Sequence, residues 1–134
     1  MKALTLTALL LTGSFAQAQT TKTIECSFTE PFFALTVDLE KKTVTRVEPD
    51  WENDAGKTKS TVIARGIRVK TNMKDVFRPE YKILAADGSV VAEMTFDNEG
   101  SNGMSDTVFP YSMKYDGMLG GCSSDRVKSV EPRY

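Results

Sequence analysis

Residues 103–122, GMSDTVFPYSMKYDGMLGGC, contain the features from which the fold can be predicted. The stretch holds an aromatic run with a period of two, a turn at Asp116-Gly117, a glycine pair and the second of only two cysteines. The first cysteine, Cys26, lies in ECSFTEPFF near the other end of the chain. We expect a disulfide between Cys26 and Cys122, since two cysteines without any histidine cannot form an ordinary structural zinc site. The alternatives are free thiols or an intermolecular bond.

The first 18 residues show the order of regions found in a secretory signal peptide. Lys2 supplies a positive charge, residues 3–15 are uncharged and apolar or small, and Ala16-Gln17-Ala18 is a small-x-small cleavage site. The apolar run is shorter than the roughly 20 residues that a membrane-spanning helix needs. No cysteine follows the cleavage site, so we expect a periplasmic or secreted protein without a lipid anchor or an integral membrane segment. The alternative is a buried N-terminal helix.

Cleavage after Ala18 would leave 134 − 18 = 116 residues, which is the size of one domain spanning residues 19–134. This part has 17 − 1 = 16 basic residues against 18 acidic ones. Because phosphate binding requires a basic excess or a basic stripe, we expect no nucleic-acid partner. Export also places the cysteines in an oxidising compartment, where disulfides persist.

Short alternating runs separated by turn signals predict an all-β domain almost without helix. Residues 48–60 are expected to form a long polar loop, and Gly66 a bulge within one strand. The alternative for this strand is an unbroken run that is buried on both faces near its start. The polar tail, residues 124–134, is expected to lie at the periphery. About eight strands are predicted, near residues 22–28, 32–39, 42–48, 60–70, 80–86, 89–96, 107–115 and 118–123.

Consecutive hairpins imply antiparallel pairing, and a disulfide between the first strand and the last region would bring two edges of the sheet together. Closing these edges hides unpaired backbone groups. We therefore expect a small antiparallel up-and-down barrel, or a flattened barrel that resembles a sandwich.

The composition argues against an enzyme. The chain has no histidine, which removes the commonest general base and the usual nucleophilic triads. No catalytic or nucleotide-binding motif is present, so we expect no catalytic residues and no cofactor. Ser–Lys or paired-carboxylate chemistry remains as an alternative.

The acidic loop 97–106, DNEGSNGMSD, offers many oxygen atoms but does not match an EF-hand. We expect turns rather than a metal site. Trp51 lies in a polar segment and is a candidate anchor for a partner, because tryptophan is enriched at interface hot spots. The alternative is that Trp51 folds back as a lid on one end of the barrel. The candidate partner-contact residues are Trp51, Asp97, Glu99, Asn102 and Asp106.

Glu30 lies between Thr29 and Pro31 and is flanked by phenylalanines. We expect it to be partly buried and to need a partner, for which Arg65 is a candidate. We interpret the role of Glu30 as structural rather than catalytic. Tyr111 and Tyr115 could line a small pocket, but their period-two spacing favours the core.

Two motifs in this chain resemble those of a poorly characterised bacterial family of small exported proteins or lipoproteins. They are Cys26-x-x-Thr29-Glu30-Pro31-Phe32-Phe33 and the sequence from Gly103-Met-Ser-Asp106 through Phe109-Pro110-Tyr111 to Gly120-Gly121-Cys122. Phe33 stands where the family usually has tryptophan, and the lipid-attachment cysteine of the lipoprotein members is missing. We expect structural roles for the motif residues Glu30, Pro31, Phe33, Met104, Ser105, Pro110, Gly120 and Gly121.

In that family the domain sometimes accompanies META-type domains or domains similar to inhibitors of lysozyme, which implies a role in the cell envelope. The expected function is a non-enzymatic exported binding module with an unidentified protein or small envelope ligand. The first alternative is an inhibitor of a hydrolase such as lysozyme, with the acidic loop facing a basic enzyme. The second is an enzyme that uses Glu30 with another carboxylate or a lysine.

Overall fold

The computed structural model describes residues 20–131, and for residues 54 and 55 it describes the backbone only. Within this range the secondary structure consists of nine strands and contains no helix. The predicted signal peptide lies outside the described residues. The strands are β1 (Thr23–Phe28), β2 (Phe33–Asp38), β3 (Thr43–Asp50), β4 (Asp54–Arg65), β5 (Arg68–Asn72), β6 (Glu80–Leu84), β7 (Val90–Gly100), β8 (Phe109–Tyr115) and β9 (Met118–Ser124).

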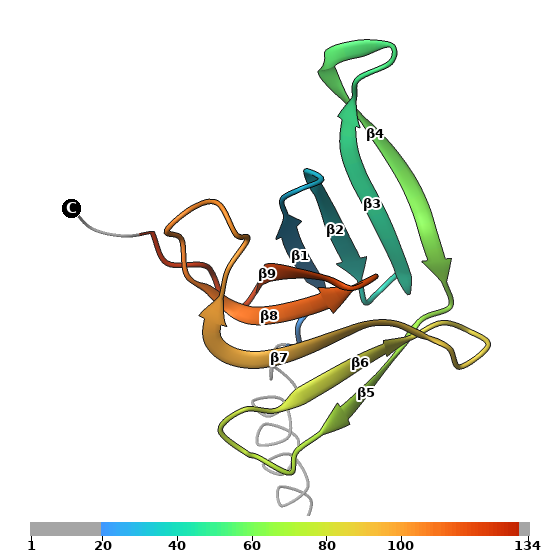
Figure 1. Ribbon diagram of the computed structural model, residues 1–134. Coiled ribbons are helices and arrows are strands. Elements are labelled where there is room, and N and C mark those ends of the chain that lie inside the picture. Colours follow the sequence, from blue (N-terminus) through green and yellow to red (C-terminus); the bar gives the residue numbers. More distant parts are fainter. Residues whose placement is uncertain (1–19, 132–134) are drawn as a thin grey trace, which may run out of the picture.

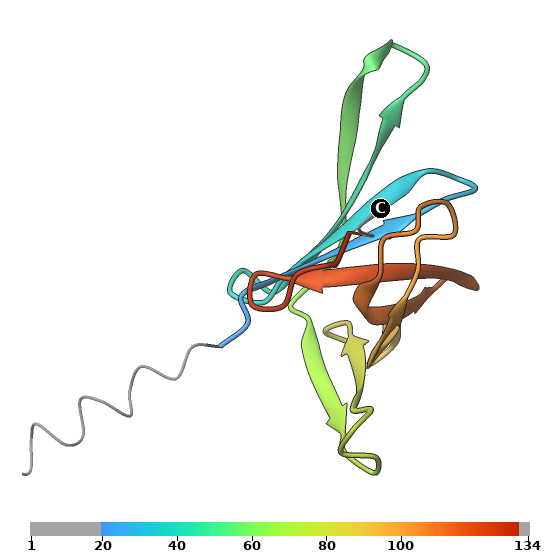
Figure 2. The same cartoon turned by 90° about the vertical axis from the view of Figure 1, so that its left-hand side faces the viewer.

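The strands form one curled antiparallel sheet with the order β4-β3-β2-β1-β9-β8-β7-β6-β5 (Figure 1). The prediction of an all-β, antiparallel, up-and-down fold is therefore confirmed. The sheet does not close into the expected barrel, because β4 and β5 at its two ends are not paired with each other. In two perpendicular views the β3–β4 and β5–β6 hairpins extend to opposite sides of the molecule (Figures 1 and 2).

The chain turns from one edge of the sheet to the other at Gly66. The single strand expected over residues 60–70 is divided here, so the sheet has nine strands rather than about eight. Gly66 has a φ of 64°, and the next residue, Ile67, donates its backbone N–H to the carbonyl of Lys42 at 3.2 Å. The part before Gly66 pairs with β3 and the part after it pairs with β6.

The expectation of a long loop over residues 48–60 was wrong. Strands β3 and β4 continue through most of this segment, and only Trp51, Glu52 and Asn53 form the turn. Pairing extends outward as far as Asp50 opposite Asp54. The polar composition reflects exposure of the strands rather than a lack of strand structure, since β4 is an edge strand whose described outer residues are exposed.

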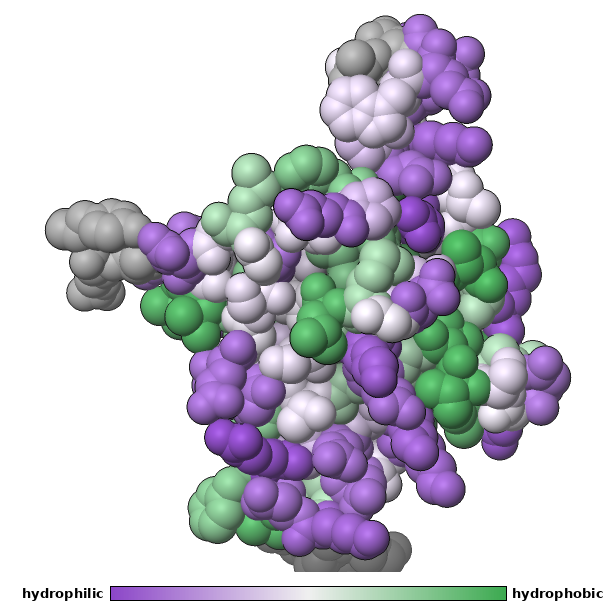
Figure 3. Space-filling view, in the orientation of Figure 1, coloured by the Kyte–Doolittle hydropathy of each residue, from purple (hydrophilic) through white to green (hydrophobic). Residues whose placement is uncertain are grey.

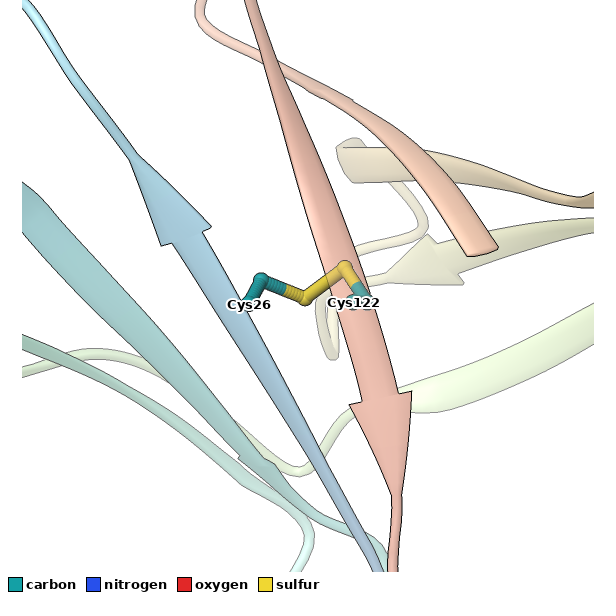
Figure 4. The surroundings of a disulfide bond; sticks show 2 residues. All are labelled: Cys26 and Cys122. Carbon is teal, nitrogen blue, oxygen red and sulfur yellow. A yellow bond between two sulfur atoms is a disulfide. The ribbon is translucent and has the colours of Figure 1, made fainter. Parts of the chain in front are cut away.

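The disulfide between Cys26 and Cys122 forms as predicted and joins β1 to β9 (Figure 4). The two cysteines are direct register partners and are fully buried. They do not bring two edges of the sheet together, because the β1–β9 pair lies in the middle of the strand order. The bond therefore fastens the first and last strands at the centre of the core.

The core lies on the concave side of the curled sheet and contains two aromatic groups that meet on β8. Tyr115 makes edge contacts with the stacked rings of Phe28 and Phe33. Tyr111, also buried, makes edge contacts with Tyr81 and Phe96. Burial raises the pKa of the Tyr111 hydroxyl, and a hydrogen bond with Ser124 opposes the change. Tyr111 thus belongs to the core, as its spacing predicted.

The described part of the tail returns to the sheet. Val130 pairs with Val108 through two backbone hydrogen bonds of 2.8 and 3.0 Å. The Asp125 carboxylate accepts hydrogen bonds from the backbone N–H groups of Lys22 and Thr23 at 3.0 and 3.2 Å. The tail lies at the surface, where most of its side chains are exposed, but these contacts attach it to Val108 before β8 and to the start of β1.

Candidate functional site

The two sequence motifs meet at one open groove of about 650 Å³. The TEPFF segment supplies Thr29, Phe32 and Phe33, and the loop after β7 supplies Met104 and other residues. The third side comes from the outer part of the β3–β4 hairpin, including Pro49 and Thr58, which are register partners. Segments that are far apart in the sequence therefore build one surface.

The floor of the groove consists of small side chains on the face of the sheet opposite the core. Ser27, Ala34 and Val47 lie in one row across β1, β2 and β3, each being the register partner of the next. They alternate along their strands with the inward-facing residues Phe28 and Phe33. Because these floor side chains are short, the groove is hollow between its walls.

The wall formed by the loop after β7 is tied to the end of β1. The Thr29 hydroxyl donates a hydrogen bond to the Asn102 carbonyl at 2.6 Å. The Asn102 side-chain oxygen accepts hydrogen bonds from the N–H groups of Met104 and Ser105 at 3.0 and 2.9 Å. Gly103 has a φ of 83°, and a Cβ at this position would lie 3.0 Å from Thr29 Oγ1. These contacts hold Met104 with 71% of its surface exposed.

The β1–β2 turn forms the end of the groove, and the exposure of Glu30 in this turn differs from the prediction. Glu30, with a φ of 58°, precedes a cis peptide bond to Pro31. Glu30 is exposed, and so is Arg65 at the end of edge strand β4, so the expected buried pair does not form. Phe32, two residues after Glu30, stays exposed beside the groove.

Arg46 supports the groove from the core side, and sequence reasoning did not identify it. Its guanidinium lies 4.0 Å from the centroid of the Phe33 ring and 3.4 Å from the Glu48 carboxylate. The Nε atom is buried and has no hydrogen-bond partner among the described residues. A cation over an aromatic face stabilises the ring, so Arg46 helps to fix Phe33. No local sequence signal distinguishes Arg46 from a solvated cation in a hairpin.

Trp51 lies at the tip of the protruding β3–β4 hairpin with 71% of its surface exposed. The interpretation of Trp51 as a lid is therefore wrong. The Asp50 carboxylate accepts hydrogen bonds from both the backbone N–H and the side-chain amide of Asn53, which closes the turn. Trp51 is not among the residues that line the groove.

The other candidate contact residues are dispersed, because the expected loop 97–106 begins only after Gly100. Strand β7 continues to Gly100 and contains Asp97 and Glu99. Asp97 accepts hydrogen bonds from the Ser112 hydroxyl at 2.8 Å and from the Glu99 N–H at 3.0 Å. Glu99 also lies 3.3 Å from the Arg78 guanidinium. Asp106 is exposed on the loop, while Asn102 lines the groove. Asn102 therefore lies at the groove together with the motif residues Met104 and Ser105. Asp97 instead stabilises the fold through its hydrogen bonds.

The glycine pair lies under packed aromatic residues, and Pro110 is buried nearby in sequence. A Cβ at Gly120 would stand 2.7 Å from the Phe28 ring and from the Ser27 carbonyl oxygen, and one at Gly121 would collide with the Phe109 ring. Pro110 is buried within β8. The glycines therefore admit aromatic rings against β9 as well as a neighbouring backbone.

Within residues 20–131, no group of three or more carboxylate, cysteine or histidine side chains is arranged to hold a metal ion. Among the same residues, no helix is long and apolar enough to cross a membrane. No protein-family model, curated protein or solved structure matches the chain. The resemblance drawn from the two motifs therefore stays a prediction.

Proposed function

We propose that this chain is an exported, non-enzymatic binding module that takes an apolar side chain of a protein partner into the groove beside Phe32 and Met104. The observation that carries the proposal is the meeting of the two motifs at one open, mainly apolar surface. Exposed apolar side chains rimmed by polar ones are typical of interaction sites. The polar rim here includes Asn102, Ser105 and Glu48.

A protein partner fits the shape of this surface better than a small molecule does. Small ligands are normally buried over most of their surface in concave pockets. This groove is open along its length, and a hairpin projects beside it as a further contact surface (Figures 1 and 3). Figure 3 shows that the hairpin is largely hydrophilic, whereas apolar patches gather on the body of the molecule.

Export is part of the proposal, and the disulfide supports it. A structural disulfide persists in the periplasm or outside the cell, whereas the cytosol keeps thiols reduced. The order of charged, apolar and small residues before Gln19 supports the same compartment.

A photo-crosslinking amino acid at Met104 is expected to capture one defined protein from an envelope fraction. The matched control is the same amino acid at Leu119 of β9, which is 72% exposed against 71% for Met104 but does not line the groove. With the captured protein purified, Phe32→Ser and Met104→Ser should each raise the Kd about tenfold or more, because apolar anchors dominate interface energies. Equal capture at both positions, or an unchanged Kd, would contradict the proposal.

Inhibition of a hydrolase such as lysozyme is the second candidate, and the protruding hairpin supports it. Residues 48–54 contain four acidic residues and no basic residue, with Trp51 exposed among them. An acidic, aromatic tip suits the cleft of a basic enzyme. In this second proposal the β3–β4 hairpin, rather than the acidic loop, contacts the enzyme, because Asp97 and Glu99 are engaged within the molecule.

A stoichiometric amount of the protein should then lower lysozyme activity, and Trp51→Ala should weaken inhibition at least about 30-fold, as expected for loss of a hot-spot tryptophan. Trp51 is exposed, so the variant should keep the thermal stability of the wild type. Undiminished lysozyme activity would remove this candidate and leave the groove proposal standing.

A further inference from the structure

The β5–β6 connection presents apolar side chains to solvent at the end of the molecule opposite the β3–β4 hairpin (Figures 1 and 2). Phe77 is 86% exposed, and Met73 and Val76 in the same connection are also exposed. In Figure 3 this region, at the lower left, shows apolar surface beside strongly hydrophilic surface. Large apolar side chains exposed together usually mark a contact surface.

Hydrogen bonds within the connection hold it in this shape. The Asn72 side-chain oxygen accepts a hydrogen bond from the Lys74 N–H at 3.0 Å. The Asp75 carboxylate accepts one from the Phe77 N–H at 2.9 Å, and its carbonyl accepts one from the Arg78 N–H at 3.1 Å. The Phe77 side chain is thus presented by an ordered turn.

The β5–β6 hairpin that carries the apolar tip has an excess of positive charge. Residues 68–82 contain five basic and two acidic residues, whereas the rest of the chain contains 17 − 5 = 12 basic and 18 − 2 = 16 acidic ones. Lys70 and Lys82 are direct register partners on β5 and β6, and on its other side Lys82 is the register partner of Glu93 on β7. Lys70 thus faces a like charge, which is unfavourable within the sheet, while Lys82 also has a carboxylate as its neighbour. Both line a hollow of about 320 Å³ together with Met73 and Glu80.

We propose that the β5–β6 hairpin docks on an anionic phospholipid surface. Phe77, Val76 and Met73 enter the interfacial layer, and Lys70, Lys74 and Lys82 contact the phosphate groups. Apolar side chains combined with flanking cations bind such surfaces, since each cation adds electrostatic attraction to apolar burial. Arg78 and Lys82 contribute less, because Arg78 is paired with Glu99 and Lys82 is the register partner of Glu93.

A bilayer suits this tip better than a folded partner does. Stable protein interfaces bury more than roughly 1,000 Å² in total, which requires a broad complementary surface. Here the exposed apolar residues belong to one short connection between two five-residue strands. The groove and the hairpin tip at Trp51 play no part in this inference, so it stands independently of the proposed function.

Co-sedimentation with vesicles tests the proposal. The purified protein should bind vesicles of equimolar phosphatidylcholine and phosphatidylglycerol, and Phe77→Ser should lower the partition coefficient about tenfold. The double variant Lys70→Gln/Lys74→Gln, with Phe77 intact, should lower the partition coefficient by about fivefold per cation at low salt. Leu119→Ser is the matched control, since Leu119 is exposed on β9, and should leave binding unchanged.

Mass spectrometry must show the same N-terminus in every variant, and circular dichroism the same Tm, so that processing or unfolding cannot cause the difference. Equal binding by wild type and Phe77→Ser would overturn the proposal. So would equal binding to vesicles of phosphatidylcholine alone, or the absence of vesicle binding. Self-association that Phe77→Ser abolishes, without any vesicle binding, would assign the tip to a second copy of the chain and would equally overturn it.

Discussion

Removal of the disulfide by the double substitution Cys26→Ala/Cys122→Ala is expected to lower the free energy of unfolding by about 4 kcal/mol. The bond closes a loop of 96 residues, and the loss of chain entropy in the unfolded state grows with loop length. Such a loss is a large fraction of the total stability of a domain of this size. Denaturation by urea, followed by circular dichroism, measures the change.

Chemical reduction of the unaltered protein is the control for this prediction. Reduction breaks the bond but leaves both sulfur atoms in the core, so it separates the effect of the cross-link from that of lost packing. The reduced protein should lose most of the stability that the double variant loses. If mass spectrometry found two free thiols in protein purified from an oxidising compartment, the central role of the bond would be refuted.

Gly100→Ala is expected to destabilise the protein by at least about 3 kcal/mol, near the upper end for overpacking of a core. A Cβ at this position would collide with the backbone carbonyl oxygen of Tyr111 and would stand 2.7 Å from the carbonyl carbon and 2.9 Å from the Phe109 Cβ. Backbone atoms within a sheet cannot rotate away as a flexible side chain can. Either β7 or β8 must therefore shift.

Gly88→Ala provides the matched control, because nothing lies within 4 Å of a Cβ there. Gly88 has a φ of 88°, so alanine should cost only the backbone strain, about 1 kcal/mol. Urea denaturation of both variants measures the difference. If the two losses of stability agreed within experimental error, the close approach of β7 and β8 at Gly100 would be wrong.

The sequence was sufficient to predict the strands that have one apolar face and a sharp turn. Asp87-Gly88 and Asp116-Gly117 each connect two predicted strands, and both glycines have a positive φ. The pairing of Cys26 with Cys122 was equally predictable, because the described chain has no other cysteine. In these places the local pattern and the tertiary structure favour the same conformation.

The outer β3–β4 hairpin was not predictable in this way. The outer part of β4 is exposed and that of β3 is half-buried, so neither shows the alternation of apolar and polar residues that reveals a strand with one buried face. The alternating pattern over residues 60–70 was recognised, but the division at Gly66 depends on which neighbour each half pairs with. A local sequence pattern does not show that the two halves of a run pair with strands at different edges of the sheet.

The groove depends on tertiary contacts that no local pattern specifies. The two motifs were visible in the sequence, yet their meeting depends on the Thr29–Asn102 hydrogen bond across 73 positions. The burial of Glu30 was predicted wrongly for a similar reason, since the conformation of the turn rather than the neighbouring residues decides its exposure. Arg46 was missed because its contact with Phe33 joins two strands.

The central position of the β1–β9 pair has a consequence for the order of folding. Hairpins such as β1–β2 or β8–β9 form from neighbouring residues, whereas the strand pair that unites both halves must wait for the final strand of the chain. Pairing between residues so distant in sequence is slow compared with local pairing. A nascent chain therefore cannot form its central strand pair until β9 has emerged, so the two halves of the sheet stay separate until synthesis is nearly complete.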